Sequence, residues 1–365
     1  MLAWLWVGFI VFVLAMLAID LFLVNRKPHI INIREALGWT GVCVVLALAF
    51  NVGVYFIYEH DLFGIGEKFA HMRPGDDPAP AGGMGRPAAI QFLSGWLIEY
   101  SLSMDNIFVI ALIFSHFRVK REHQHRILFW GILGALILRG IMIGVGSALV
   151  AQFEWILYLF GAILIFTAYK LVAQKEDDFH PENGFVLRLS RRLLPISPEP
   201  DGQRFGTRIN GKFFFTPLFV VLLVVETTDV VFAIDSIPAI FGITRDPFLV
   251  FTSNVFAIIG LRSLYFALAA LIEKFTYVKF SLAFILAFVG VKMLLEGVQH
   301  LRGLADWAFA GVPAWLGWLP AEPVHLSPGV SLSIIAASLI VGIGTSFVVS
   351  SKQQDPAEPD PPPGA

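Results

Sequence analysis

The sequence predicts an all-α, polytopic membrane protein of about nine transmembrane helices, including two inverted three-helix repeats. Three observations lead to this fold class. First, 56% of the 365 residues are hydrophobic and only 15% are charged, more apolar residues than a water-soluble surface could cover. Second, the apolar residues form long blocks of about 20, the length that crosses about 30 Å of hydrocarbon. Third, two of these blocks carry acidic residues in the same order.

The blocks are expected to form one helix each. The first lacks a basic leading segment, is long for a secretion signal and carries Asp20 near its end, so we interpret it as a retained helix. In chain order the nine blocks are residues 2–24, 38–58, 88–115, 127–150, 153–173, 213–241, 248–272, 280–298 and 328–350.

The positions of lysine and arginine between the blocks predict the orientation. Basic residues in a membrane protein are concentrated in its cytoplasmic loops. Here they concentrate in the odd-numbered loops, including the linker 174–212, which places the N-terminus outside and the C-terminus inside. The odd loops hold Arg26, Lys27, Arg34, Arg118, Lys120, Arg121, Arg126, seven residues between 175 and 212, Lys274 and Lys279, and the even loops hold Lys68, Arg73, Arg86, Arg245 and Arg302.

Two blocks contain acids in the middle of an apolar stretch. The third reads EYSLSMDNIFVIALIF from Glu99, and the sixth reads VETTDVVFAIDSIPAIF from Val225. Aligning Asp105 with Asp235 pairs Asn106 with Ser236 and Glu99 with Asp229. In each half an arginine and then a lysine follow on the next two helices, and these are Arg139 with Lys170 and Arg262 with Lys292.

The order acid, acid, Arg, Lys therefore spans three helices in each half. Because three is odd, the second copy enters the membrane from the opposite side, which is the inverted repeat of many secondary transporters. The predicted organisation is residues 1–87 (two helices and an external loop), 88–173 (first repeat), 174–212 (cytoplasmic linker), 213–298 (second repeat), 299–350 (external loop and last helix) and 351–365 (disordered tail).

Helical spacing separates the acids into two groups. Glu99, Ser103 and Asn106 fall on one face of an ideal helix, and Glu226, Asp229 and Ser236 share a face in the second repeat. Asp105 and Asp235 each lie six residues after the upstream acid, roughly 120° around the helix. Either the helix unwinds locally to bring both acids together, or the two acids make different polar contacts.

A functional role for these acids is favoured over a purely structural one, because placing an ionised side chain at the bilayer centre costs about 2.5–3.5 kcal/mol of insertion free energy. Carboxylate, amide and hydroxyl oxygens suit hard divalent cations such as Mn²⁺, Mg²⁺ or Ca²⁺. We therefore predict a cation site in which Ser103 and Glu226 support the ligands or carry protons. The predicted ligands are Glu99, Asp105, Asn106, Asp229, Asp235 and Ser236.

A structural alternative is that the acids only neutralise buried cations as ion pairs. Mid-helix Arg139 and Arg262 are expected to hold the carboxylates when no cation is bound. Lys170 and Lys292 lie near helix ends, where they are expected to snorkel rather than to contact substrate.

The strings EYSLSMDNIFV, VETTDVVFAIDSIPA, GILGALILRG and FTSNVFAIIGLRSLYF resemble the TerC/Alx family of bacterial membrane proteins from about residue 90 to 296. This resemblance implies a manganese exporter of the bacterial inner membrane, linked in some members to tellurite resistance or alkaline response. Met104 stands where the family usually has a small aliphatic residue, which leaves open a ligand role for its sulfur. The site is acidic, whereas a tellurium oxyanion would need arginine or N–H donors.

Other functions remain open at this stage. An exchanger for Ca²⁺ or another divalent cation would use the same oxygens, and a membrane scaffold for metal loading of exported proteins would move no ion. An intramembrane aspartyl protease is disfavoured because G-x-G-D is absent, as are H-E-x-x-H and G-x-S-x-G, so we expect no enzyme. The expected partners are a divalent cation and the bilayer, with no permanently bound cofactor, no nucleic acid and protein partners undetermined.

The predicted topology is tested with reporters in two loops. A reporter fused after Lys352 should be cytoplasmic, and one inserted near Gly82 should be external, because an odd number of spans and the Lys/Arg distribution agree. The measurement is reporter activity on each side of the membrane. Opposite labelling would reverse the assigned sides of the repeats.

Overall fold

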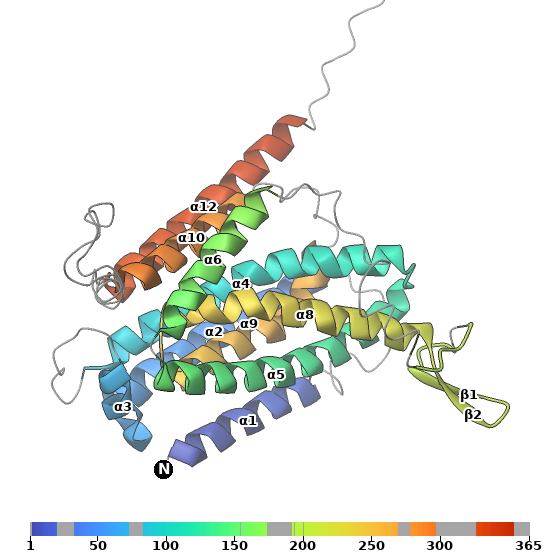
Figure 1. The fold of residues 1–365 in the computed structure, drawn as a ribbon, viewed down its shortest axis with the longest axis horizontal. Helices are drawn as coiled ribbons and strands as arrows, with labels where there is room; N and C mark the ends of the chain where they lie inside the picture. Colours follow the sequence, from blue (N-terminus) through green and yellow to red (C-terminus); the bar gives the residue numbers. More distant parts are fainter. Residues whose placement is uncertain are drawn as a thin grey trace, which may run out of the picture.

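The structure is a computed structural model that describes residues 2–19, 33–72, 83–153, 155–173, 192, 194–199, 201–268, 278–296 and 326–353. The described chain is helical apart from one hairpin (Figure 1). In order its elements are α1 (Leu2–Ile19), α2 (Ile33–Glu59), η2 (Leu62–Gly64), α3 (Ile65–Met72), α4 (Gly85–His116), α5 (Arg121–Gln152), α6 (Ile156–Ala173), β1 (Gly206–Ile209), β2 (Lys212–Phe215), α8 (Pro217–Phe241), α9 (Pro247–Leu268), α10 (Val278–Glu296) and α12 (Pro328–Gln353).

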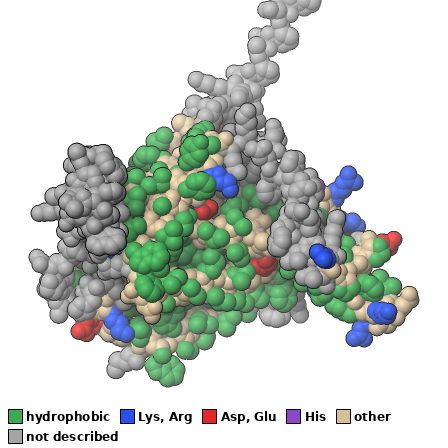
Figure 2. Space-filling model, viewed as in Figure 1, with side chains coloured by type: hydrophobic (Ala, Val, Ile, Leu, Met, Phe, Trp, Pro, Cys, Tyr) green, Lys and Arg blue, Asp and Glu red, His purple; other side chains and the backbone are tan. Residues whose placement is uncertain are grey.

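Eight helices within the described residues are long and apolar enough to cross a membrane, namely α1, α2, α4, α5, α6, α8, α9 and α12. The eighth predicted block forms α10, a 19-residue helix that packs along α6. Large apolar side chains are exposed around the bundle, including Phe166 and Ile340 at 65% and 72%. Figure 2 shows such side chains covering most of one face, with few charges among them. The predicted all-α, multi-pass membrane fold is confirmed.

Local signals shift some predicted boundaries. Extended Lys120 precedes α5, which begins six residues before the predicted block, so His123 and His125 lie on a helix rather than in the expected loop. Residues 213–215 were predicted to open the sixth helix, but they form β2 and the helix starts at Pro217. This correction follows from the turn Asn210–Gly211, whose φ values of 51° and 78° suit a two-residue hairpin.

The centre of the molecule is built from helices of both predicted repeats. Helix α4 packs on α9, and α5 packs on α8, while α4 also contacts α8 and α5 contacts α9. On one side, α1 and α2 cover this centre through a cluster of aromatic rings that includes Phe9, Phe50 and Phe256. On the other side, α6, α10 and α12 run obliquely to the central helices (Figure 1).

Glycines allow α6 and α10 to cross at close range. A Cβ atom on Gly161 would lie 3.0 Å from the carbonyl oxygen of Gly290, and one on Gly290 would lie 2.8 Å from the oxygen of Gly161. Small residues of this kind let transmembrane helices approach with their backbones in contact. Gly161 and Gly290 therefore determine the point at which α6 and α10 cross.

The C-terminal end of α2 holds two other segments in place. The Tyr58 hydroxyl donates to Asp246 Oδ2 at 2.9 Å, and Glu59 Oε2 accepts from the Gly85 N–H at 3.0 Å. Asp246 also caps α9, since its Oδ1 accepts from the N–H of Phe248 at 2.8 Å. Burial raises the pKa of Asp246 above its ordinary value of 3.8, although the hydrogen bond from Tyr58 opposes this effect.

The raised pKa of Asp246 predicts a pH-dependent part of the folding stability. Because the fold favours the protonated carboxyl, stability should rise as the pH falls through the raised pKa toward 3.8, and should be lost as the pH rises. Asp246→Asn should lack this component. The measurement is the unfolding midpoint of detergent-solubilised protein against pH, with the partly exposed Asp201→Asn as the control. Parallel profiles for the parent and Asp246→Asn would contradict the prediction.

Candidate functional site

Arg139 lies at the centre of a polar cluster between the two predicted repeats. It is on the middle of α5, at the nineteenth of 32 helical residues, and its side chain is 2% exposed. At this depth the guanidinium cannot reach water by extending along the helix. Its charge is therefore compensated by neighbouring protein groups.

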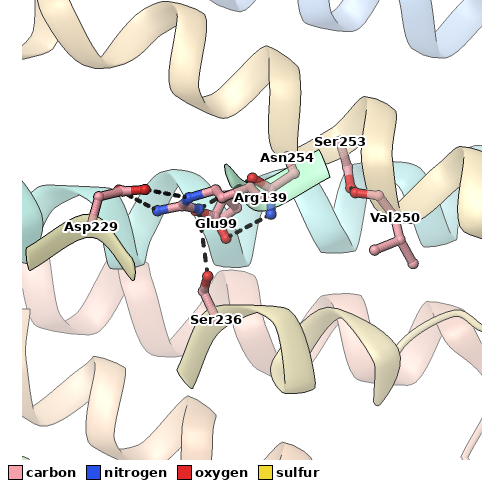
Figure 3. Close-up of polar contacts among 7 residues, drawn as sticks. All are labelled: Glu99, Arg139, Asp229, Ser236, Val250, Ser253 and Asn254. Carbon is pink, nitrogen blue, oxygen red and sulfur yellow. Dashed lines mark hydrogen bonds and ion pairs between the residues drawn. The ribbon is translucent and has the colours of Figure 1, made fainter. Parts of the chain in front are cut away.

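One carboxylate from each predicted repeat binds this guanidinium (Figure 3). Glu99 of α4, which is fully buried, accepts from Nη1 through its Oε1. Asp229 of α8 accepts from Nη2 through Oδ1 at 2.8 Å and from Nε through Oδ2 at 3.1 Å. Arg139 thus holds Asp229 in the bidentate geometry that suits a planar guanidinium.

Two neutral side chains complete the cluster. Asn254 of α9 accepts from Arg139 Nη1 through Oδ1 at 3.2 Å and donates from Nδ2 to Glu99 Oε2 at 3.3 Å. Ser236 Oγ lies 3.5 Å from Nη1, at the outer limit of a hydrogen bond. The cluster therefore joins all four central helices.

The electrostatics of the cluster follow from these contacts. Two ionised carboxylates around one guanidinium leave a net charge of about −1, which the amide and hydroxyl groups can spread but not remove. Removing charges from water is costly, and a buried pair is tolerated only where its hydrogen bonds are satisfied. The arrangement is therefore stable only while the arginine and both acids stay together.

Glu226 and Ser103 lie next to this cluster in sequence but differ from it in bonding. Glu226 packs against Gly134 of α5, where a Cβ atom would overlap its carboxyl group. Its Oε2 is buried and has no hydrogen-bond partner among the described residues, and the same holds for Ser103 Oγ. Asn106 is also buried on α4.

Asp235 faces another helix. Its Oδ1 accepts from the hydroxyl of Thr167 on α6 at 2.7 Å, and Lys170, one turn further along α6, is near enough to interact with its charge. Helix α8 runs unbroken from Pro217 to Phe241 with Pro238 inside it. Of the two alternatives left open by the spacing, this structure has the second, in which Asp235 and Asp229 make different polar contacts.

The remaining predicted residues are placed as follows. Asp105 lies on α4 and Arg262 on α9, but their side chains are outside the described part of the structure. Lys170 is exposed, and its snorkelling stays a prediction. That prediction is wrong for Lys292, which is 6% exposed and donates from Nζ to the carbonyl of Gly242 at 3.1 Å, because α10 buries it against the end of α8.

The described residues contain no group of three His, Cys, Asp or Glu side chains arranged to hold a metal ion. Glu99 and Asp229 are instead separated by Arg139. A cation could use these oxygens only after the guanidinium withdrew from at least one of them. In this conformation Arg139 blocks the candidate ligands Glu99 and Asp229, so the cluster is not an open cation site.

Asn254 is the one member of the cluster that the sequence reasoning missed. It sits in the run Thr252-Ser253-Asn254 within the mostly apolar first half of α9, and that run of three polar residues could have indicated it. The hydroxyls of Thr252 and Ser253 bond carbonyls of their own helix, at 2.7 Å to Phe248 and 3.2 Å to Val250. Only the asparagine of this run bonds across to α4 and α5.

Comparison with known proteins places the chain in a family. Residues 84–354 match the Integral membrane protein TerC family. An uncharacterized membrane protein of Myxococcus xanthus is 45% identical over 95% of this chain and 92% of its own length. Alx of Escherichia coli strain K12, a proposed membrane-bound redox modulator, is 43% identical over 94% of this chain and 95% of its own length. No solved structure matches the chain. With matches of this extent, the chain belongs to the TerC family of integral membrane proteins.

Proposed function

We propose that the protein exports a divalent cation, with Mn²⁺ as the expected ion, through the carboxylates that Arg139 now holds. The observation that carries the proposal is one buried guanidinium bound to a carboxylate from each half of the centre. Glu99 belongs to the first helix triplet (α4, α5 and α6), and Asp229 belongs to the second (α8, α9 and α10). Both acids lie near the middle of their helices, where an ionisable residue favours function over packing. Binding of the cation and release of Arg139 would then be alternative states of one site.

The packing of the helices supports alternating access by two inverted repeats. If a twofold axis exchanges α4 with α8, α5 with α9 and α6 with α10, then the contact of α4 with α9 corresponds to that of α5 with α8. The contact of α6 with α8 likewise corresponds to that of α10 with α4. Secondary transporters with such repeats bind substrate near the midplane and move one repeat against the other.

Exchange of Arg139 for a divalent cation would bring the net charge of the site from about −1 to about zero. A divalent cation brings two positive charges to Glu99 and Asp229, and oxygen ligands are what Mn²⁺ and similar hard ions prefer. Asp235, beside Thr167, is then a further acid near the site. The same oxygens would bind Ca²⁺, so the choice between Mn²⁺ and Ca²⁺ is tested with the panel of cations below.

Orientation and location belong to the same proposal. The Lys/Arg distribution favours an external N-terminus and a cytoplasmic C-terminus in the bacterial inner membrane. Export to the periplasm then means uptake into inside-out vesicles. We propose no resident cofactor and no enzymatic reaction.

A redox role, suggested by the name of the Escherichia coli relative, has less support. Cys43 is the chain's one cysteine, so no intrachain disulfide can form, and it lies on α2 outside the matched residues 84–354. The bonding around Arg139 favours ion transport instead.

Transport is tested by Mn²⁺ uptake into inside-out vesicles. Glu99→Gln and Asp229→Asn should each reduce the rate by about 10-fold or more, because a charged ligand is lost while the side-chain shape is kept. A panel of Mn²⁺, Mg²⁺ and Ca²⁺ tests selectivity. Asp201 is a partly exposed aspartate outside the spanning helices, and Asp201→Asn should transport like the parent. Full activity in both site variants at parental abundance would show that the site is elsewhere.

The charge balance of the cluster is tested by stability. Arg139→Gln should destabilise the protein by about 3–5 kcal/mol, because the buried Glu99 and the partly buried Asp229 lose their partner. Adding Glu99→Gln and Asp229→Asn to this variant should recover membrane abundance and the unfolding midpoint without restoring transport. An Arg139→Gln protein as stable as the parent would refute the charge argument.

A further inference from the structure

At the cluster, the amide of Asn254 has no counterpart in the first helix triplet. Aligning Arg139 with Arg262 places Asn254 opposite Gly131, eight residues before each arginine. The first triplet thus has no side-chain amide at this position. The site is asymmetric, and the second triplet supplies both Asp229 and a neutral oxygen.

Both ends of this amide are engaged, and its side chain is buried at 1% exposure (Figure 3). Nδ2 donates to Glu99 Oε2, the oxygen that does not accept from Arg139, at 3.3 Å. Oδ1 accepts from Arg139 Nη1 at 3.2 Å. Asn254 therefore touches the same guanidinium nitrogen that binds Glu99.

Withdrawal of Arg139 would affect the two ends differently. The bond from Nδ2 to Glu99 does not involve the arginine, so it can persist and keep the carboxylate oriented. Oδ1 would lose its donor, and a buried carbonyl oxygen without a partner costs about 1–3 kcal/mol. The position that Arg139 would leave is filled in this structure by its positive guanidinium. The neighbours of that position are the Glu99 and Asp229 oxygens.

We infer that the amide oxygen of Asn254, which now accepts a hydrogen bond from Arg139, coordinates the transported cation when Arg139 withdraws. Asn254 is then a ligand in the loaded state. This inference rests on the proposed transport function and assigns it a further ligand. A neutral amide oxygen is a normal ligand of hard divalent cations, alongside carboxylates. It adds to the coordination sphere without adding negative charge, so the site can release Arg139 and the cation in turn.

The experiment compares Mn²⁺ transport kinetics in inside-out vesicles for the parent and for Asn254→Leu, Asn254→Ser and Asn254→Asp. Leucine removes the oxygen, and the serine hydroxyl is too short to reach the position of the amide oxygen. Both variants should raise the KM for Mn²⁺ by about 10-fold to 100-fold. Asn254→Asp returns an oxygen to that position, so its KM should fall back toward or below that of the parent.

Thr252→Val is the matched control on the same helix. Its hydroxyl bonds only carbonyls of α9, so the substitution keeps the shape and leaves the cluster intact. The KM should equal that of the parent. A purely structural role for Asn254 would instead lower the abundance of its variants and leave the KM of the surviving protein unchanged.

Each result decides the inference. If the leucine variant does not accumulate in the membrane, the KM of the serine variant tests the same point, because it also lacks an oxygen at the position of the amide oxygen. A parental KM in the leucine or serine variant, or an equal rise in the serine and aspartate variants, would overturn the ligand role while transport stands. A parent protein that moves no Mn²⁺ would overturn the proposed function and this inference together.

Discussion

The burial of the Arg139 charge is the constraint on which the centre of this protein depends. A guanidinium at the depth of mid-helix α5 is tolerated only with anionic partners at bonding distance, and these come from α4 and α8. Because Asn254 joins from α9, a rotation or a shift of any central helix would break at least one of these bonds. The cluster therefore sets the register of four helices as well as holding candidate ligands.

The sequence was most informative where the energetic cost of a residue in lipid is large. Glu99, Asp229 and Arg139 could be identified because charges in apolar blocks are costly, and the mid-helix position of Arg139 predicted that it holds carboxylates. Asn254 was missed because an amide is cheaper to bury and appears ordinary within an apolar helix. The spacing left two arrangements of Asp235 and Asp229 open, and the packing of α6 against α8 selects the one in which Asp235 bonds Thr167.

Hydropathy was a weaker guide at the ends of the helices. A run of three phenylalanines reads as membrane helix, yet Phe213 to Phe215 pair with β1 because the turn at Asn210 and Gly211 folds the chain back. Pro217 then opens α8, where its missing N–H carries no cost. Lys292 illustrates the same limit, since its burial depends on the neighbouring end of α8 rather than on its position in its own helix.

The C-terminal end of α2 has a mechanical consequence. Tyr58 bonds the turn before α9, and the next residue, Glu59, bonds the first residue of α4, so adjacent residues of one helix bridge the two triplets. If the triplets part on this side of the bundle, α2 can follow only one of them. Both contacts lie at the C-terminal end of α2, and they differ in burial. The bond from Tyr58 to Asp246 is buried, whereas the bond between Glu59 and Gly85 is only partly buried. Water competes more strongly for the Glu59–Gly85 bond, so a parting of the triplets would break it before the bond from Tyr58 to Asp246.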